Sequence, residues 1–489
     1  MKITKLLENL AHIDSDLNVV GLTLNSNEVM DGYVFIALNG AEKNGLIYAK
    51  QAIEKGACAI LFDEFDYEMA NEYISNSSIL KIPVSNLVEN VGMIAARFYG
   101  EPSQFLNVIG ITGTNGKTSC SQFLGQVLEH CGVIGTLGWG RHGEKLKETL
   151  NTTPDALAIQ NMLLALREKH CENVAMEVSS HGLAQSRVNG IKFKGAVFTN
   201  LSRDHLDYHR TMDAYLETKL KLFDMLELEF AVINLDDDVS EQVVTVIPQS
   251  VEVIGITTTG KQAARGHTLL AQNIELNLSG IQCDVGWKNQ KQILHIPLIG
   301  KFNLENVLCV LAVMLKLGMN LDEAAKHLMD LKQVNGRMER FGGKNNQPLV
   351  IVDYAHTPAA LEKVLRSLRS HTKGRLGVVF GCGGNRDRGK RPQMGRVAEE
   401  FADWVIVTDD NPRFESSEAI VQDILNGCFR NESKVIYDRA KAIRRAIEHA
   451  SPQDCVLIAG KGHENYQEIN GVKFAFNDAE CVREIMVQA

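Results

Sequence analysis

The sequence lacks the features that define several classes of protein. No apolar run approaches the roughly 18 residues of a membrane-spanning helix, so we expect no membrane insertion. Basic residues are fewer than acidic ones, 51 against 60, and the net charge of −9 argues against a general nucleic-acid-binding protein. There is no internal repeat and no low-complexity tract. The first ten residues include Glu8 and predict an amphipathic helix, not a signal peptide.

The spacing C-x-x-C is also absent, although the sequence contains ten cysteines. Several of them, such as Cys58, Cys309 and Cys455, lie in apolar runs, as reduced cysteines in a protein core do. This pattern is typical of a cytoplasmic protein. A length of 489 residues predicts about three domains. With 45% hydrophobic and 23% charged residues, each domain can bury a core.

The stretch from Val108 to Thr118 reads V-I-G-I-T-G-T-N-G-K-T. A β-branched run enters a glycine-rich turn, and a helix is predicted over Ser119–His130. In such a turn the backbone N–H groups surround an anion, Lys117 offers a charge to the outer phosphates, and Thr118 offers a hydroxyl to Mg²⁺. Gly110 lies six residues before Gly116, which departs from the common spacing. The alternative is a plain turn with a surface lysine, but the strand–turn–helix context favours nucleotide phosphate binding.

The order of predicted elements gives an α/β protein of three domains. Residues 1–98 form a first, small α/β domain, with helices over Tyr48–Glu54 and Leu87–Phe98 and a strand over Ala57–Phe62. The breaker Y-G-E-P from Tyr99 is a candidate linker to the second domain, residues 99–335. The third domain, residues 336–489, alternates strands and helices, which predicts a Rossmann-like parallel sheet. Its strands are predicted over Leu349–Val352, Leu376–Phe380, Trp404–Thr408, Lys434–Tyr437 and Cys455–Ala459.

The second domain should contain a mostly parallel sheet of the phosphate-loop type. Strands predicted over Asn173–Val178 and Lys194–Thr199 end in the polar loops S-S-H-G and N-L-S-R-D-H-L-D-Y-H, which should face the phosphate loop. Alternating residues over Ala271–Ile299 predict an antiparallel ribbon. Helices are predicted over Leu304–Leu317 and Leu321–Leu331, the second capped by Asn320 with Glu323.

Several polar residues are candidates for chemistry. Glu177 follows a buried strand and either holds Mg²⁺ opposite Thr118 or caps a loop. The dense group Asp204, His205, Asp207 and His209 is suited to zinc, to a Mg²⁺-dependent phosphate site, or to ordinary turn chemistry. The pattern around Lys219 alone predicts a solvated lysine.

Further candidates stand near the start of helices and at the ends of strands. Asn303 is either a helix N-cap or a partner for a base. Arg337 and Asp353 lie near the junction of the second and third domains, and an arginine there suits a polyphosphate. The loop Asp410–Arg413 reads D-N-P-R and gives a guanidinium for bidentate binding of a carboxylate.

Together these motifs resemble those of the Mur ligases, the ATP-dependent amide-forming enzymes of peptidoglycan synthesis, over nearly the whole chain. The resemblance rests on T-G-T-N-G-K-T, N-T-T-P from Asn151, E-V-S-S-H-G-L from Glu177, T-N-L-S-R-D-H-L-D-Y-H from Thr199, G-K-F-N-L-E-N from Gly300, N-G-R-M-E from Asn335 and D-Y-A-H-T-P from Asp353. The segments G-C-G-G-N-R-D-R-G-K-R, D-N-P-R and G-K-G-H-E are similar to those of members that add 2,6-diaminopimelate.

The resemblance implies that ATP phosphorylates the D-glutamate carboxylate of a UDP-N-acetylmuramoyl dipeptide, and that an amine then attacks the acyl phosphate. It implies catalytic roles for Lys117, Glu177, His205, Lys219 and Arg337. It implies ATP contacts from Gly113, Thr114, Asn115, Gly116, Lys117, Thr118, Ser119, Asn303, Arg337 and Asp353. Mg²⁺ ligands would be Thr118, Glu177, His205 and a carbamylated Lys219, which overrides the solvated interpretation of that lysine.

The resemblance also implies two substrate sites. The UDP-muramoyl dipeptide would contact Ser26, Asn151, Thr152, Thr153, Ser179, Gln185 and Arg187. The diaminopimelate site would comprise Arg386, Asp410, Asn411, Pro412, Arg413, Gly460 and Glu464. Meso-diaminopimelate carries one carboxylate more than lysine, and lysine would leave Arg413 without its partner, so diaminopimelate is the expected amino acid. We expect a cytoplasmic monomer that binds no nucleic acid.

One departure and three alternatives stay open. The loop G-A-E-K-N-G from Gly40 stands where relatives often show a histidine and D-G, which puts local contacts to the UDP group in question. The alternatives are a lysine-adding ligase, a folylpolyglutamate-type ligase, and a phosphate-loop regulator that binds nucleotide without making an amide. D-N-P-R and N-T-T-P argue against the first two, and a second metal site argues against the third.

Overall fold

The computed structural model describes residues 1–488, apart from residues 41–42, 75–77, 278–279, 344–345 and 431. These residues form two compact units. The first comprises Met1–Thr112, Leu128–Ala196 and Lys221–Glu229, and the second comprises Gly113–Val127, Val197–Leu220 and Phe230–Ala489. The expected α/β class with mostly parallel sheets is confirmed. None of the helices in the described residues is both long and apolar enough to cross a membrane.

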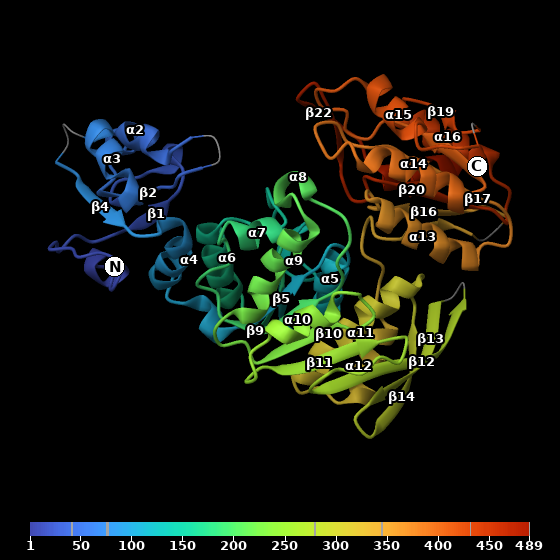
Figure 1. Ribbon diagram of the computed structural model, residues 1–489, viewed down its shortest axis with the longest axis horizontal. Helices are drawn as coiled ribbons and strands as arrows, with labels where there is room; N and C mark the ends of the chain where they lie inside the picture. The colour runs from blue at the N-terminus through green and yellow to red at the C-terminus, as the bar shows by residue number, and fades with distance from the viewer. Residues whose placement is uncertain (41–42, 75–77, 278–279, 344–345, 431, 489) are drawn as a thin grey trace. The chain divides into compact units, whose positions relative to one another are not determined.

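The N-terminal part of the first unit is a four-stranded parallel sheet in the order β1-β2-β3-β4, drawn in blue in Figure 1. Alternate strand residues pack on helices α1 and α4 on one face and on α2 and α3 on the other. The elements are α1 (Ile3–Leu6), β1 (Gly21–Thr23), β2 (Tyr33–Ala37), α2 (Ala49–Glu54), β3 (Ala59–Asp63), α3 (Tyr67–Tyr73), β4 (Leu80–Val84) and α4 (Leu87–Phe98), with 3₁₀ turns η1 (Ser26–Glu28), η2 (Gly45–Tyr48) and η3 (Glu64–Asp66).

The rest of the first unit is built on strands in the order β9-β5-β8-β6-β7. Strands β5, β8 and β6 are parallel, and β7 closes the edge as an antiparallel neighbour of β6. The last two residues of β9 belong to the second unit. The elements are η4 (Pro102–Phe105), β5 (Asn107–Thr112), β6 (Cys131–Gly135), β7 (Gly138–Arg141), α6 (Ala156–Glu168), β8 (Asn173–Glu177), α7 (Ser180–Ala184), β9 (Phe193–Phe198) and η5 (Lys221–Asp224).

The second unit begins with the phosphate-loop helix and continues with strands in the order β14-β13-β12-β11-β10. Strands β10 to β12 are parallel, and β12 to β14 form the predicted antiparallel ribbon. The elements are α5 (Lys117–Val127), α8 (Leu206–His209), α9 (Met212–Leu220), β10 (Phe230–Asn234), α10 (Ser240–Val246), β11 (Glu252–Thr257), β12 (His267–Asn277), β13 (Gly280–Trp287), β14 (Gln290–Ile296), α11 (Lys301–Lys316) and α12 (Leu321–Met329).

The C-terminal part of the second unit is a six-stranded sheet in the order β15-β16-β20-β17-β18-β19, in which only β15 is antiparallel (Figure 1). Helices α13 to α15 cover one face, and α16 and α17 cover the other. The elements are β15 (Glu339–Gly342), β16 (Leu349–Asp353), α13 (Pro358–His371), β17 (Leu376–Phe380), α14 (Lys390–Phe401), β18 (Trp404–Val407), α15 (Ser417–Leu425), β19 (Lys434–Val435), α16 (Arg439–His449), β20 (Cys455–Ala459), β21 (Tyr466–Ile469), β22 (Val472–Ala475) and α17 (Asp478–Gln488).

Most predicted elements occur within a few residues of their expected bounds, and α4, β17 and β20 have the predicted bounds. Three predictions need correction. The N-terminal helix is a single turn, Ile3–Leu6, because Asn9 already adopts a positive φ of 61°. Strand β19 pairs over only two residues, Lys434–Val435, both of them exposed at the sheet edge. Helix α11 begins at Lys301, three residues before the expected start.

A fully buried ion pair holds the C-terminal domain together. Nε and Nη2 of Arg439 each lie 2.7 Å from a carboxylate oxygen of Asp478, and neither side chain is exposed. Nη2 also donates to the Ala459 carbonyl at the end of β20. We therefore expect Asp478→Asn to lower the free energy of unfolding by about 3–5 kcal/mol, because the buried guanidinium loses its counter-charge. Chemical denaturation measures this. The exposed Asp322–Lys326 pair is the control, for which Asp322→Asn should change stability by under about 1 kcal/mol.

Candidate functional site

The loop Gly113–Gly116 precedes helix α5 and has a backbone that requires glycine at two positions. Gly113 has a φ of +144° and Gly116 a φ of +90°. A Cβ on Gly113 would lie 1.9 Å from Oγ1 of Thr199, and one on Gly116 would lie 2.5 Å from Oδ1 of Asn306. The loop therefore places bare backbone at the N-terminus of an α-helix, where an anion is stabilised by N–H groups and by the helix dipole.

The segment after β9 holds this loop in place. The Thr114 N–H donates to the Asn200 carbonyl at 2.8 Å, and the Asn115 N–H donates to the Asn200 side chain at 3.0 Å. Thr199 donates its hydroxyl to the Asn115 carbonyl at 2.6 Å. These bonds fix the loop conformation through residues of the T-N-L-S motif.

Two lysines converge on the carbonyl of Gly113. Nζ of Lys117 donates to it at 2.8 Å and to the Thr114 carbonyl at 2.9 Å, while Nζ of Lys219 donates to it at 3.0 Å. Lys219 is 1% exposed and lies 4.4 Å from the centre of the Tyr215 ring, so the solvated interpretation of this lysine is wrong. Burial, followed by the nearby charge of Lys117, holds the pKa of Lys219 well below its usual value.

Arg337 joins the helix start to a pocket in the same unit. Its Nη2 donates to Oγ1 of Thr118 at 3.2 Å, and its guanidinium lies 4.5 Å from the centre of the Tyr354 ring. Its Nε is buried with no hydrogen-bond partner among the described residues, which fits a site for an anionic ligand. The pocket is lined by Asn115, Gly116, Ser119, Asn200, Phe302, Glu305, Asn306, Arg337, Asp353, Tyr354, Ala355, Ala360, Lys363 and Val364.

The predicted metal-binding cluster is smaller than expected. Oδ2 of Asp204 lies 3.5 Å from Nε2 of His205 and 4.0 Å from Nε2 of His356. Burial lowers the pKa of His205 to about 4, against an opposing effect of Asp204, so its ring is neutral at pH 7. The ring of His209 instead packs against Tyr215 at 5.1 Å. No three His, Cys, Asp or Glu side chains in the described part of the chain gather as a metal site.

In the first unit, Glu177 ends strand β8 and gathers several predicted substrate residues. Its carboxylate accepts from the N–H and the hydroxyl of Thr136, and it is fully buried. Oγ1 of Thr153 donates to the Glu177 carbonyl and accepts from the Ser179 N–H. Nη1 of Arg187 donates to the Thr153 carbonyl at 2.7 Å. Glu177 thus orders a loop of the first unit through Thr136, and its role as a Mg²⁺ ligand stays a prediction.

The remaining dipeptide-site residues are less closely associated. Nη2 of Arg187 donates to Gln185 at 2.6 Å, and the hydroxyl oxygens of Thr136 and Thr152 lie 3.1 Å apart. Asn151 is exposed. Ser26 is buried in the N-terminal domain, where its hydroxyl donates to Gln51 at 2.7 Å. Residues 41 and 42 of the unusual loop G-A-E-K-N-G lie outside the described residues.

The loops predicted to bind the amino acid do come together in the C-terminal domain. Asn411 donates to Oε2 of Glu464 at 2.8 Å, and the buried Nζ of Lys461 donates to both of these side chains. A Cβ on Gly460 would lie 2.7 Å from a carboxylate oxygen of Asp410, so this position requires glycine. Arg413 is partly buried and bonds to Glu468.

Two other residues of this site lie against the G-C-G-G loop. A Cβ on Gly383 would lie 2.9 Å from Nη1 of Arg413 and 3.6 Å from Cγ of Arg386. Arg386 is exposed, and the Pro412 carbonyl packs close to Gly384. The two arginines predicted to contact the amino acid therefore flank the same glycine.

Comparison with known proteins identifies the family. Sequence models described as Mur ligase family, catalytic domain, Mur ligase middle domain, and Mur ligase, glutamate ligase domain match residues 18–99, 111–314 and 336–462. The chain is 46% identical to the UDP-N-acetylmuramoyl-L-alanyl-D-glutamate–2,6-diaminopimelate ligase of Pseudomonas aeruginosa, covering 96% of this chain and 95% of the relative. This chain belongs to the Mur ligase family.

Other relatives of this Mur ligase agree. The ligase of the same name from Ectopseudomonas mendocina is 45% identical over 95% of this chain and 94% of its own length. A solved structure of a protein with that name has a TM-score of 0.70 at 33% identity, covering 100% of this chain and 99% of its own. MurF from Acinetobacter baumannii, 17% identical with a TM-score of 0.66 and coverage of 99% and 98%, shares the fold. The expected three-domain organisation is confirmed, while its boundaries after residues 98 and 335 stay predictions.

One predicted role in this Mur ligase is wrong. Asn303 is not an N-cap, because α11 begins before it and Gly300 occupies the cap position. The Asn303 amide instead donates to the Ile299 carbonyl at 2.7 Å, inside the first turn of the helix. Asn306, one turn further along α11, lines the pocket that also contains Arg337. The three-residue spacing of Asn303 and Asn306 could have indicated from the sequence that both side chains lie on the same side of the helix.

Sequence reasoning missed further residues of the site. Asn200 fixes the phosphate loop through its main chain and side chain, and only the fold brings it there. Glu468 lies on the hairpin β21–β22, which was not predicted. Its turn is Asn470-Gly471, both with positive φ, and this dipeptide between two short β-forming runs is a known hairpin signal.

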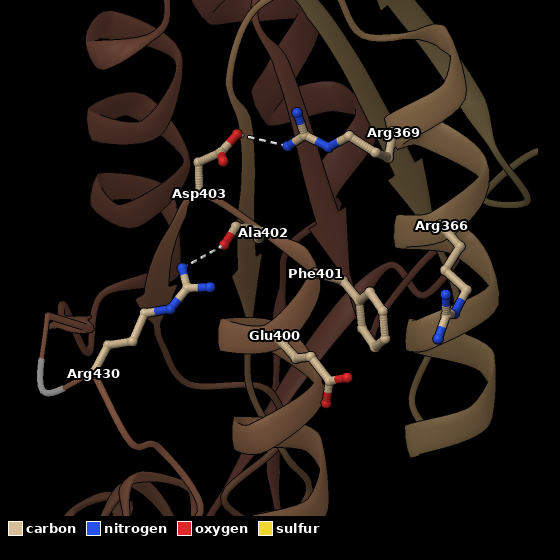
Figure 2. A pocket seen from close by; sticks show the side chains of 7 residues that line it. All are labelled: Arg366, Arg369, Glu400, Phe401, Ala402, Asp403 and Arg430. Carbon is tan, nitrogen blue, oxygen red and sulfur yellow. Dashed lines mark hydrogen bonds and ion pairs between the residues drawn. The ribbon is translucent and has the colours of Figure 1, made fainter.

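A second pocket of this Mur ligase lies at the amino end of β18 (Figure 2). Its three arginines already have protein partners. Arg369 pairs with Asp403 at 2.6 Å, Arg430 donates to the Ala402 carbonyl at 3.2 Å, and Arg366 stacks on the ring of Phe401 at 4.1 Å. The arginines therefore tie helix ends to the sheet, and we assign no ligand to this pocket.

Proposed function

We propose that this Mur ligase joins meso-2,6-diaminopimelate to the D-glutamate carboxylate of UDP-N-acetylmuramoyl-L-alanyl-D-glutamate, with conversion of ATP to ADP and phosphate, in peptidoglycan synthesis. The observation that carries the proposal is that relatives 43–46% identical, matching this chain over nearly its full length, bear the name of that ligase. The D-N-P-R and G-K-G-H-E loops, which meet in the C-terminal domain, support the same amino acid.

The reaction needs two steps that gather negative charge. A substrate carboxylate oxygen forms a bond to the γ-phosphorus of ATP as the bond to ADP breaks. The amine of diaminopimelate then forms the amide bond, loses a proton, and displaces phosphate. Lys117 and Arg337 would stabilise the charge on the transferred group, since both side chains meet the start of α5. In this family ATP supplies the energy, and a ligase of related fold, MurF of Thermotoga maritima, has been solved with ADP.

The residues fit ATP and Mg²⁺ by their chemistry. The glycine cradle at Gly113 and Gly116 and the unpartnered Nε of Arg337 suit a polyphosphate. Thr118 and Glu177 would ligate one Mg²⁺, and His205, whose ring is neutral, would hold a second together with a carbamylated Lys219. Mg²⁺, when bound, would neutralise phosphate charge and polarise the transferred group. A neutral Lys219 amine is the form that reacts with CO₂, which supports the carbamylation proposal.

The other assigned roles belong to this proposal. Residues 1–98 would bind the UDP group, residues 99–335 ATP, and residues 336–489 the amino acid. Asp353 would contact the nucleotide and also hold the backbone around it, since its carboxylate accepts hydrogen bonds from the Met338 and Ala355 N–H groups. We further propose a cytoplasmic monomer that binds no nucleic acid. All ten cysteines are free thiols, as is usual in a reducing compartment.

The experiment offers the protein ATP, Mg²⁺ and the UDP-muramoyl dipeptide, with either meso-diaminopimelate or L-lysine, and measures phosphate release and the UDP product. We expect turnover with diaminopimelate and a preference over lysine of about 10⁴-fold, because lysine leaves Arg413 unpaired. Turnover with lysine alone would contradict the Arg413 argument. No turnover with either amino acid would contradict the ligase proposal and favour a nucleotide-binding regulator, while glutamyl addition to a folate would favour a folylpolyglutamate-type ligase.

A further inference from the structure

The hairpin β21–β22 is attached along the D-N-P-R loop. The Arg413 N–H donates to the Glu468 carbonyl at 3.0 Å, and the Asn470 N–H donates to the Arg413 carbonyl at 2.7 Å. The Glu468 N–H donates to Oδ1 of Asn411 at 2.9 Å. Arg413 has a φ of +55°, which a residue with a side chain rarely adopts. The hairpin therefore holds Arg413 in a backbone conformation that it would not keep by itself.

The guanidinium of Arg413 is fixed on two sides. Its Nε donates to Oε2 of Glu468 at 3.2 Å, and its Nη1 donates to the Gly384 carbonyl at 2.9 Å. Nη2 makes no hydrogen bond to any described residue. Nη2 and the second hydrogen of Nη1 thus remain for a ligand, and these are the donors that a bidentate bond to a carboxylate uses.

We propose that Glu468 is a positioning residue for amino-acid selection. Its carboxylate locks the Arg413 side chain so that the Nη edge is presented to the far carboxylate of diaminopimelate. This inference rests on the proposed function, since it needs that substrate to be the one selected. A preset guanidinium loses little side-chain entropy on binding, and this raises affinity without any contact between Glu468 and the substrate.

A purely stabilising role would have a different signature. Arg413 and Glu468 are 17% and 21% exposed, and partly exposed pairs contribute little to stability. A purely electrostatic role would also differ, because the Glu468 carboxylate beside Arg413 would repel the substrate carboxylate, and its removal would then improve binding. The positioning role predicts instead that removal of Glu468 raises the KM for diaminopimelate. It predicts no change in kcat/KM for lysine, because lysine has no far carboxylate.

The test compares wild type with Glu468→Ala, Glu468→Gln and the control Val472→Ala, an exposed residue of β22 that pairs with Ile469 across the hairpin. Steady-state kinetics give kcat and KM for meso-diaminopimelate and kcat/KM for L-lysine, and thermal unfolding confirms that each variant is folded. We expect Glu468→Ala to raise the KM for diaminopimelate about tenfold or more, in line with loss of a charged hydrogen bond, with kcat and the lysine value unchanged. Glu468→Gln keeps an acceptor oxygen and should restore most of the affinity.

The outcomes separate the inference from the function on which it rests. If wild type makes no product from diaminopimelate, both fail. If wild type is active and folded Glu468→Ala keeps its KM, or if Glu468→Ala and Glu468→Gln both lower it, the positioning role is wrong and the proposed function stands. Equal losses with diaminopimelate and lysine would show a general structural role and would also overturn the inference.

Discussion

Lys117→Ala should abolish turnover, with kcat reduced by at least about 10³-fold, while the protein remains folded. A charged donor aimed at the transferring phosphoryl group is worth about two to three orders of magnitude in rate, and a phosphate-loop lysine also holds the nucleotide. The structure explains why the fold should survive. The Lys117 side chain donates to two carbonyls of the loop, but the bonds of the loop to Asn200 and Thr199 do not involve this side chain and would remain.

Phosphate release under saturating ATP measures the effect, and circular dichroism checks the fold. Lys326→Ala is the matched control, because that lysine is 67% exposed on α12, where it pairs with Asp322. Near-normal turnover of the Lys117 variant would refute the assignment of the loop to ATP.

Lys219→Ala should be inactive and should partly recover when a short carboxylic acid such as acetate is added. Its amine is buried, and burial together with the nearby charge of Lys117 holds its pKa well below the usual value, which favours the neutral amine that forms a carbamate. The substitution leaves a polar space beside Tyr215 and the Gly113 carbonyl that a small carboxylate can enter. The added acid would then supply the oxygens that the carbamate supplies in the wild type.

Turnover against acid concentration measures this recovery. Lys221→Ala is the control, because Lys221 follows α9 and is exposed. Lys219→Met, which keeps much of the side-chain volume, should be inactive and should recover less, since it fills the space. Absence of recovery in Lys219→Ala, with unchanged Mg²⁺ binding, would count against carbamylation.

The fold was predictable where burial leaves a clear local pattern. Strands such as β17 and β20 are buried on both faces, and their sequences are continuous apolar runs. The helices of this domain follow such strands in the chain, and helix α13 begins at a clear N-cap residue. The short edge strand β19 and strand β22 are exposed and β21 is mostly half-buried, so their residues lack that pattern. The sequence does contain the turn signal Asn470-Gly471, but no strands were predicted on either side of it.

The site was predictable where a motif is contiguous in the chain. The phosphate loop and the D-N-P-R loop were found for this reason. The burial of Lys219 was not, because α9 has no marked amphipathic pattern and its environment comes from Gly113, more than 100 residues away in sequence. The partners of Arg413 were missed for the same reason, since Gly384 and Glu468 lie on separate loops.

The Arg413–Glu468 pair constrains how amino-acid choice can change during evolution. Replacement of Arg413 alone, toward a site for an amino acid without the far carboxylate, would leave the partly buried Glu468 carboxylate without its cation, and so disfavour the loop. Loss of Glu468 alone would release the guanidinium. A lineage that acquires a new substrate at this site should therefore change both positions in close succession, and the two residues should be exchanged as a unit in attempts to redesign it.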